Sequence, residues 1–427
     1  MTDPQERSYR ALFAAPHVSR AVVSMETGRI AQAMLPVALV LLALTNFASP
    51  ALAGAFTFLT VFPGLLAAPF VGALIDRFGK VASIRVDYVA GAVVTALIAT
   101  LPLASPDVVP LLLGLSVVLG VSQLFSDAGF RSLFVDLVPS HLLERVNAVD
   151  SSGYQVALIA GPPIAATVFA LAGAPMTFLA IAVAYGASAV FTIGLGETRH
   201  APAARQPLLR SAVEGIAYVW GNATLRGMAI SVSVTGVALG IATIVVPVLI
   251  VEQLRADEAL VGVAFAVAGM CGVAGAVVIG RLDTRGHERM LIVAAHGVMT
   301  VAALLLLPAT AAGVVAGMAW ILVSMVVRGA GESAWDLGVF ALRQRRTERH
   351  MHGRAFTISM ALNYSGVPIG AALGGWLAAT DVALALWVAV AFGTAGTLLT
   401  YLLLPRERGA VGREPVEDPH EATARHN

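Results

Sequence analysis

The sequence predicts an all-helical protein that is embedded in a membrane and built from two similar halves. Three observations predict this. The 427 residues are 58% hydrophobic and only 12% charged, whereas roughly a quarter of the residues of a soluble protein are charged. Apolar runs long enough to cross a bilayer follow one another along the chain. The unit Asp-x-x-Gly that ends one of these runs at Asp76 recurs in the second half at Asp283.

The apolar runs predict twelve membrane crossings, six in each half, because a spanning helix needs about 20 mostly apolar residues. The first run, residues 30–75, contains no Asp, Glu, Lys or Arg and is long enough for two helices. It is broken at residues 45–50, where Asn, Ser and Pro favour a turn. In chain order, the predicted crossings are residues 18–44, 50–75, 81–102, 108–130, 147–171, 175–195, 224–250, 258–280, 289–307, 313–338, 355–379 and 382–404.

Basic residues predict the orientation of the chain. Of the 27 Lys and Arg residues, 24 fall in the terminal segments and in the connections on one side of the predicted membrane. The connections on the other side contain only Arg255. Because cytoplasmic connections collect Lys and Arg, we expect a cell-membrane protein with both termini in the cytoplasm. The polar start of the chain predicts no cleaved signal peptide.

The chain divides into four predicted segments. Residues 1–195 form the first six-helix bundle and residues 224–404 form the second. Residues 196–223 connect the bundles and are expected to contain an amphipathic helix that lies on the cytoplasmic face of the membrane. Residues 405–427 are charged and contain prolines, so we expect a disordered cytoplasmic tail.

The two halves repeat each other at a nearly constant distance along the chain. Asp127 and Asp336 are 209 residues apart and end the fourth and tenth crossings. Arg145 and Arg354 precede the fifth and eleventh crossings and are also 209 residues apart. Six crossings per half give both halves the same orientation, so an axis along the membrane normal relates them. Transporters with such repeats bind their substrate near the midplane, between the halves.

The connection between the second and third crossings contains the motif Gly-x-x-x-Asp-Arg-x-Gly-Lys. The residues of this motif are Gly72, Asp76, Arg77, Gly79 and Lys80. With this motif and topology, the chain resembles a major facilitator superfamily transporter over about residues 12–404. The resemblance implies a major facilitator fold of twelve transmembrane helices in two pseudo-symmetric bundles. It also implies that the motif, with Asp283 and Gly286 as its counterpart in the second half, is a latch between the halves.

A second resemblance concerns the direction of transport. The fifth crossing contains Gly161, Pro162 and Pro163, which resemble the Gly-Pro motif of exporters in this superfamily. Residues 138–148 and the Gly-Arg step before the eleventh crossing resemble the branch that exports siderophores, macrolides and other amphiphilic compounds. Antiporters of this superfamily often have an arginine within helix four, but residues 111–126 contain no charge here, so their proton relay does not transfer to this chain.

Four ionisable residues are predicted to lie inside the membrane, where each costs roughly 2.5–3.5 kcal/mol. Glu26 and Arg29 share a face of helix one, and Arg328 and Glu332 share a face of helix ten. In the superfamily, helices one, four, seven and ten line the central cavity. The four residues are therefore candidates for a water-filled cavity and for proton coupling. The alternative is that each Glu–Arg pair is structural or extends to the membrane interface.

Further polar residues are weaker candidates. Asp127 and Asp336 occupy equivalent helix ends, where they form either a cytoplasmic gate or simple helix caps in water. Candidate substrate-lining residues on helices four, seven and ten are Gln123, Ser231, Thr235 and Ser324. The alternative for the hydroxyl groups is a hydrogen bond to their own helix backbone.

The sequence favours a transporter over an enzyme. It contains no P-loop motif for ATP, no His-Glu-x-x-His metal motif and no basic–aromatic nucleic-acid surface. Its one cysteine excludes a disulfide framework and cysteine-based metal sites. We therefore expect a monomeric, cofactor-free, proton-coupled exporter of a small amphiphilic compound such as a drug, macrolide or siderophore. The alternatives are an importer or lipid-handling transporter of the same fold, and a receptor that binds without transport.

Overall fold

The computed structural model describes residues 8–196, 208–281, 286–347 and 352–405, and within these ranges the chain consists of helices and short connections without a strand. Ten of the described helices are long and apolar enough to cross a membrane. The all-helical membrane fold predicted from the sequence is thereby confirmed. The number of twelve crossings stays a prediction, because one long helix merges two predicted crossings and another crossing is divided in two.

The first half contains the long helices that the apolar runs predict. Its α-helices are α1 (Tyr9–Ala14), α2 (Val18–Phe47), α3 (Pro50–Phe78), α4 (Lys80–Thr100), α5 (Val109–Leu137) and α6 (Leu143–Phe191), with 3-10 turns at Pro106–Val108 and Ser140–Leu142. Helix α6 is not continuous. Gly173 has φ 75° and ψ 179°, which breaks the helix where the sequence predicts a turn between the fifth and sixth crossings.

The second half follows the same order after a connecting helix, α7 (Leu208–Gly221). Its α-helices are α8 (Ala223–Val248), α9 (Ala259–Ile279), α10 (Glu288–Leu304), α11 (Val314–Arg346), α12 (His352–Tyr364), α13 (Gly366–Ala378) and α14 (Val382–Leu403), with a π-helical turn at Leu249–Gln253 and a 3-10 turn at Leu307–Thr310. Helices α12 and α13 together cover the predicted eleventh crossing and are separated at Ser365.

Local sequence signals explain where several helices begin and end. The Ser49 hydroxyl accepts a hydrogen bond from the Leu52 amide (3.2 Å) and precedes Pro50, which suits the first turn of α3. Asp381 caps α14 in the same manner through the amide of Ala383 (2.8 Å). Gly79, with φ 96°, ends α3 and allows α4 to start at the next residue.

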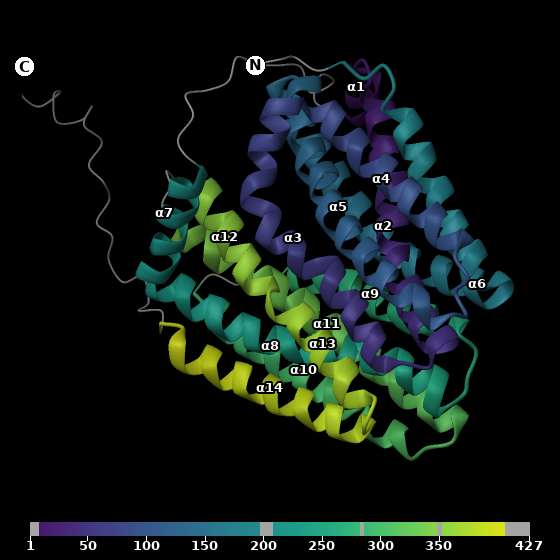
Figure 1. Cartoon of the computed structure of the whole chain (residues 1–427). Coiled ribbons are helices and arrows are strands. Elements are labelled where there is room, and N and C mark those ends of the chain that lie inside the picture. The colour runs from purple at the N-terminus through teal and green to yellow at the C-terminus, as the bar shows by residue number, and fades with distance from the viewer. Residues whose placement is uncertain (1–7, 197–207, 282–285, 348–351, 406–427) are drawn as a thin grey trace, which may run out of the picture.

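The helices form two bundles that touch mainly along two pairs of helices. Within the first half, α2 packs against α3 and α6; within the second, α8 packs against α13 and α14. Helices α3 and α13, and helices α6 and α9, make most of the contacts between the halves, and α2 and α3 also touch α8. Figure 1 shows the first half in purple to blue and the second in teal to yellow, diverging toward the side of α1 and α7. We call this the α1–α7 side and the opposite one the far side.

Small residues let the two halves meet closely on the far side, where α3 begins and α13 ends. A Cβ atom added at Gly375 would lie 2.9 Å from the Cα atom of Gly54 on α3. On the second pair of helices, a Cβ atom at Gly262 would lie 2.5 Å from the Cα atom of Pro163. Such short distances leave room only for glycine, as in other membrane helix contacts. The structure is therefore closed on the far side.

Helix α7 covers the segment for which the sequence predicts an amphipathic helix. One face carries the buried Val219, which packs with Leu225 of α8 and Leu362 of α12. Ile216 and Trp220 are exposed on the helix surface. An apolar exposed surface next to a membrane protein suits the membrane interface, so the interfacial position stays a prediction that this geometry fits.

We expect Gly375→Ala to open the far side, because the added methyl group would overlap with the backbone of α3 near Gly54. Spin labels at the exposed far-side positions Ala104 and Ala311, with Cys271 replaced, would report a longer distance between the halves. Gly297→Ala is the control, since a Cβ atom there meets no atom within 4 Å. An unchanged distance distribution in Gly375→Ala would contradict the proposed closure contact.

Candidate functional site

A cavity of about 430 Å³ lies between the two halves. Ser151 and Gln155 of α6 form its wall in the first half, and residues of α11 and α12, including Asp336 and Tyr364, form its wall in the second. Ligand sites in proteins typically have volumes of roughly 300–1,000 Å³. The cavity is therefore large enough for a small organic molecule. It lies between the halves, as the repeat relation predicts, but toward one membrane face and not at the midplane.

The cavity lies nearer the α1–α7 side. Its wall residues fall within the halves of α6 and α11 that lead to this side, whereas the close glycine contacts join the far ends of the helices. Asp336 is exposed although it belongs to the predicted crossing 313–338, and Phe340, just beyond that crossing, is exposed as well. The chain is thus closed on the far side and accessible from the side that the sequence predicts to be cytoplasmic.

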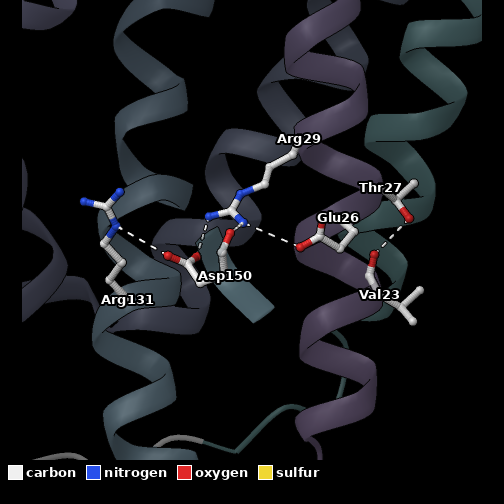
Figure 2. A network of polar contacts seen from close by, with 6 residues as sticks. All are labelled: Val23, Glu26, Thr27, Arg29, Arg131 and Asp150. Atoms are coloured by element: carbon white, nitrogen blue, oxygen red, sulfur yellow. Dashed lines mark hydrogen bonds and ion pairs between the residues drawn. The ribbon is translucent and has the colours of Figure 1, made fainter. Parts of the chain in front are cut away.

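The wall of the first half is backed by a network of charged groups (Figure 2). Arg29 is only 6% exposed and donates two hydrogen bonds to Asp150, to the carbonyl oxygen (2.7 Å) and to Oδ1 (2.5 Å). Glu26 Oε1 lies 3.5 Å from Arg29 Nη1, and Arg131 Nε lies 4.0 Å from Asp150 Oδ2. A buried charge is tolerated when it is paired in this way. The predicted Glu26–Arg29 pair thus exists as part of a larger network.

Asp150 was missed by the sequence analysis. It directly precedes the uncharged run that begins at Ser151, so it looks like the polar flank of a membrane helix. The structure instead places it inside the bundle, between arginines of α2 and α5. Its place within the predicted fifth crossing, residues 147–171, could have indicated an ion pair, because an acid inside a membrane crossing needs a partner.

Asp87 of α4 is a second acid that the sequence analysis missed. It is 1% exposed, and Gln32 Nε2 lies 3.2 Å from its Oδ2 and 2.9 Å from the hydroxyl of Ser126. Asp127 is close enough to Asp87 to interact with it electrostatically. The candidate gate residue Asp127 therefore belongs to a polar layer that joins α2, α4 and α5.

The predicted acid–base pair of helix ten lies on α11, outside the lining of the cavity between the halves. Arg328 Nε donates to Glu332 Oε1 (2.8 Å), and Arg328 Nη2 donates to the hydroxyl of Thr243 (3.3 Å). One helical turn further along α11, Asp336 lines the cavity. Arg343 lines it too, but is 1% exposed and donates through Nη2 to the amide oxygen of Asn363 (2.6 Å).

The two candidate gate residues lie in different surroundings despite their equivalent positions. Asp127 is near Arg29, Arg131 and Asp150. Asp336 is exposed in the cavity, with Glu332 and Arg343 as its charged neighbours. Tyr154 of α6 interacts electrostatically with both aspartates. The structure therefore relates them across the cavity, but it gives only Asp336 a place in the wall.

The four predicted substrate-lining residues lie away from the cavity between the halves. Thr235 and Ser324 line a second cavity of about 20 Å³ inside the second half. This volume fits roughly one water molecule. Ser324 donates to the carbonyl oxygen of Ala302 (2.7 Å), and Ser231 is fully buried. Gln123 is half-buried on α5, and neither cavity includes Gln123 or Ser231 in its walls.

The latch motif lies at the α1–α7 end of α3. Gly72, Asp76 and Arg77 are exposed there, and Arg77 lies over the ring of Phe78 at 5.5 Å. Lys80 Nζ donates to Asp136 Oδ2 (2.6 Å), which ties the start of α4 to the end of α5. The latch role stays a prediction.

The counterpart of this motif is described only in part, because Asp283 lies outside the described residues. Gly286 has φ 79° and donates its amide to Glu288 Oε2 (3.0 Å). Glu288 forms an ion pair with Arg345, which ties the start of α10 to the end of α11. The Glu288–Arg345 pair in the second half corresponds to the Lys80–Asp136 pair in the first half. The acid and the base have exchanged positions between the two pairs.

The exporter-type motif Gly161–Pro163 takes part in helix contacts. A Cβ atom at Gly161 would lie 2.5 Å from the Cβ atom of Ala33 on α2, and Pro163 contacts Gly262 of α9 in the other half. The motif therefore lies where α6 touches both its own bundle and the opposite one.

A model of the Major Facilitator Superfamily matches residues 27–334 and 228–425. The chain belongs to the Major Facilitator Superfamily. It is therefore a multi-pass membrane transporter, and not an enzyme. The uncharacterized MFS-type transporter y4rN of Sinorhizobium fredii (strain NBRC 101917 / NGR234) is 34% identical over 379 residues, which cover 86% of this chain and 90% of y4rN.

Solved structures of other transporters share the fold. The nucleoside transporter NupG matches with a TM-score of 0.71 at 13% identity, over 91% of this chain and 100% of that one. A bacterial homologue of the iron transporter ferroportin, in an inward-facing state, has a TM-score of 0.68 at 16% identity, over 95% and 100%. A D-xylose-proton symporter has a TM-score of 0.69 at 13% identity, over 95% and 100%. These identities establish a shared fold.

We expect Asp150→Asn to destabilise the first half by about 3 kcal/mol, because it leaves the buried Arg29 with a weaker partner. Equilibrium unfolding in mixed micelles measures the loss. The double variant Arg29→Met/Asp150→Leu should be more stable than Asp150→Asn alone, since it removes both charges. A double variant that is less stable than Asp150→Asn would show that the unpaired Arg29 charge is not the source of the loss.

Proposed function

We propose that this transporter exports a small amphiphilic compound by alternating access, in exchange for protons that move inward. The observation that carries the proposal is the cavity between the halves, which combines apolar and aromatic walls with the carboxylate of Asp336. It is accessible from the predicted cytoplasmic side and closed by glycine contacts on the far side. A rocking movement of the bundles would reverse this access, as in other transporters built from repeats.

Glu332 is the residue that we assign to proton coupling. It is paired with Arg328 at 2.8 Å and lies one helical turn from the cavity residue Asp336. Protonation of Glu332 would remove the negative partner of a guanidinium group that is only 12% exposed. Because a poorly solvated charge without a partner is costly, protonation would favour a rearrangement of α11. The proton gradient would then drive the transport cycle without ATP or another cofactor.

The proposed direction rests on the fifth helix. Its Gly161–Pro163 segment resembles the exporter motif and lies in the contacts with α2 and α9. Helix packing at this point affects how α6 can move relative to the second half. A D-xylose-proton symporter has the same fold, and a symporter moves protons and substrate in the same direction. Export and import therefore have to be separated by experiment.

The deciding experiment uses inverted membrane vesicles with an acidic interior and a pH-sensitive dye. Dyes, macrolides and siderophores are added outside one at a time. An exporter carries the compound into the vesicle while protons leave, so the gradient should collapse only when both protein and compound are present. A compound that collapses the gradient only when preloaded inside the vesicles would show proton-coupled import instead. Binding without movement in either arrangement would favour a receptor.

We expect Glu332→Gln to lower proton-driven transport at least about tenfold while the protein still folds, because glutamine cannot exchange a proton. The vesicle assay gives the rate, and binding of the same compound without a gradient shows whether the cavity is intact. Glu144→Gln, at an exposed position, is the control. Full transport driven by a pH gradient in Glu332→Gln would mean that this acid is structural.

We expect Asp76→Asn to reduce transport severalfold with little change in expression, because the latch at the end of α3 would lose its charge. Asp76 is exposed in this state, so the variant should not disturb the packing seen here. Asp107→Asn, on the far side, changes the same type of charge without touching the motif. Equal transport rates in both variants would show that the motif is no latch in this protein.

A further inference from the structure

Asp336 stands out among the charged residues of the cavity. It is exposed in the cavity wall, and no Lys, Arg or His nitrogen of the described residues lies within ion-pair distance of it. Its two charged neighbours are engaged elsewhere, since Glu332 pairs with Arg328 (2.8 Å) and Arg343 donates to Asn363 (2.6 Å). A carboxylate in this position can accept a positive group from a ligand without first losing a protein partner.

Aromatic side chains surround this carboxylate. Tyr364 of α12 lines the cavity, is 38% exposed and interacts electrostatically with Asp336. Tyr154, from the opposite half, also interacts electrostatically with Asp336, but the Arg29 guanidinium lies over its ring at 5.8 Å. Phe340, one turn further along α11, is 49% exposed. Exposed ring faces next to a carboxylate attract organic cations, by roughly 0.5–2 kcal/mol per ring.

Among the described residues, the charged groups of the cavity wall are Asp336 and Arg343. Arg343 donates to the amide oxygen of Asn363 (2.6 Å), and no ion pair joins it to Asp336. A bound cation would therefore gain an ion pair with Asp336, whereas a bound anion would be repelled by it.

Trp335 forms part of the cavity wall and supports Tyr364. Its side chain is 6% exposed and stacks edge-on against Tyr364, with ring centroids 6.1 Å apart. This contact helps to hold the ring of Tyr364 beside the cavity.

We propose that this cavity binds an amphiphilic organic cation. Asp336 holds the positive group, and the ring of Tyr364 lies beside it in the cavity wall. The apolar body lies along Phe340. The claim that this cation is the transported compound rests on the proposed function. Binding itself needs no proton gradient. A bare metal ion is a poorer fit, because the described residues contain no group of three His, Cys, Asp or Glu side chains that could ligate it.

The test compares two probes of nearly the same shape and opposite charge. Tritiated tetraphenylphosphonium is bound to the purified full-length protein in detergent without a gradient, with unlabelled tetraphenylphosphonium or tetraphenylborate as competitor. We expect saturable binding that the cation displaces and the anion does not. Asp336→Asn should weaken it about tenfold or more, whereas Asp336→Glu should retain most of it. The exposed far-side variant Asp107→Asn should bind like the wild type.

The aromatic part of the site is tested at Tyr364. Tyr364→Phe keeps the ring and should bind tetraphenylphosphonium like the wild type, whereas Tyr364→Leu should lose severalfold in affinity. Thermal unfolding confirms that each variant is folded. Three results would overturn the proposal: equal binding of the two probes by the wild type, no saturable binding of the cation, or full affinity for the cation in Asp336→Asn. Saturable cation binding without any transport in the vesicle assay would retain this site and reject the exporter.

Discussion

The absence of water in the bilayer core is the constraint on which this structure depends. Every backbone amide inside the membrane needs a partner within the protein, which leaves helices as the available form for these segments. The same constraint acts on side chains. Arg29 meets Asp150 at 2.5 Å and Arg328 meets Glu332 at 2.8 Å, each in the interior of its own bundle. The charges that survive inside the membrane are therefore those that can be paired or that face the cavity.

The division into two bundles keeps the ion pairs inside each bundle, so the proposed movement of one bundle relative to the other does not have to break them. Each bundle has its own charged network and its own brace between neighbouring helices, Lys80–Asp136 in the first and Glu288–Arg345 in the second. Contacts between the bundles use small residues, such as Gly54 against Gly375. Glycine contacts involve few directional bonds, so they can separate at a low cost when the bundles rock. Strong interactions within each half and weaker ones between the halves are what alternating access requires.

The two halves share the same arrangement of helices but differ in the surroundings of equivalent residues. Asp127 and Asp336 occupy equivalent positions, but Asp127 lies near the Arg29–Asp150 network inside the first bundle, while Asp336 is exposed in the wall of the cavity. The braces show the same divergence, since the acid and the base exchange places between the halves. A duplicated frame thus carries a structural carboxylate in one half and a carboxylate that is available to a ligand in the other.

Apolar runs and glycine turns in the sequence were sufficient to predict the helical membrane fold, the break at Gly173, and the neighbouring pair Arg328–Glu332, because these depend on residues close together along the chain. The partner of Arg29 was not predictable in this way. Asp150 lies 121 residues further along the chain, and only the packing of α6 against α2 brings it there. The cavity was likewise decided by tertiary structure, because its walls come from separate helices whose rotation no local pattern fixes.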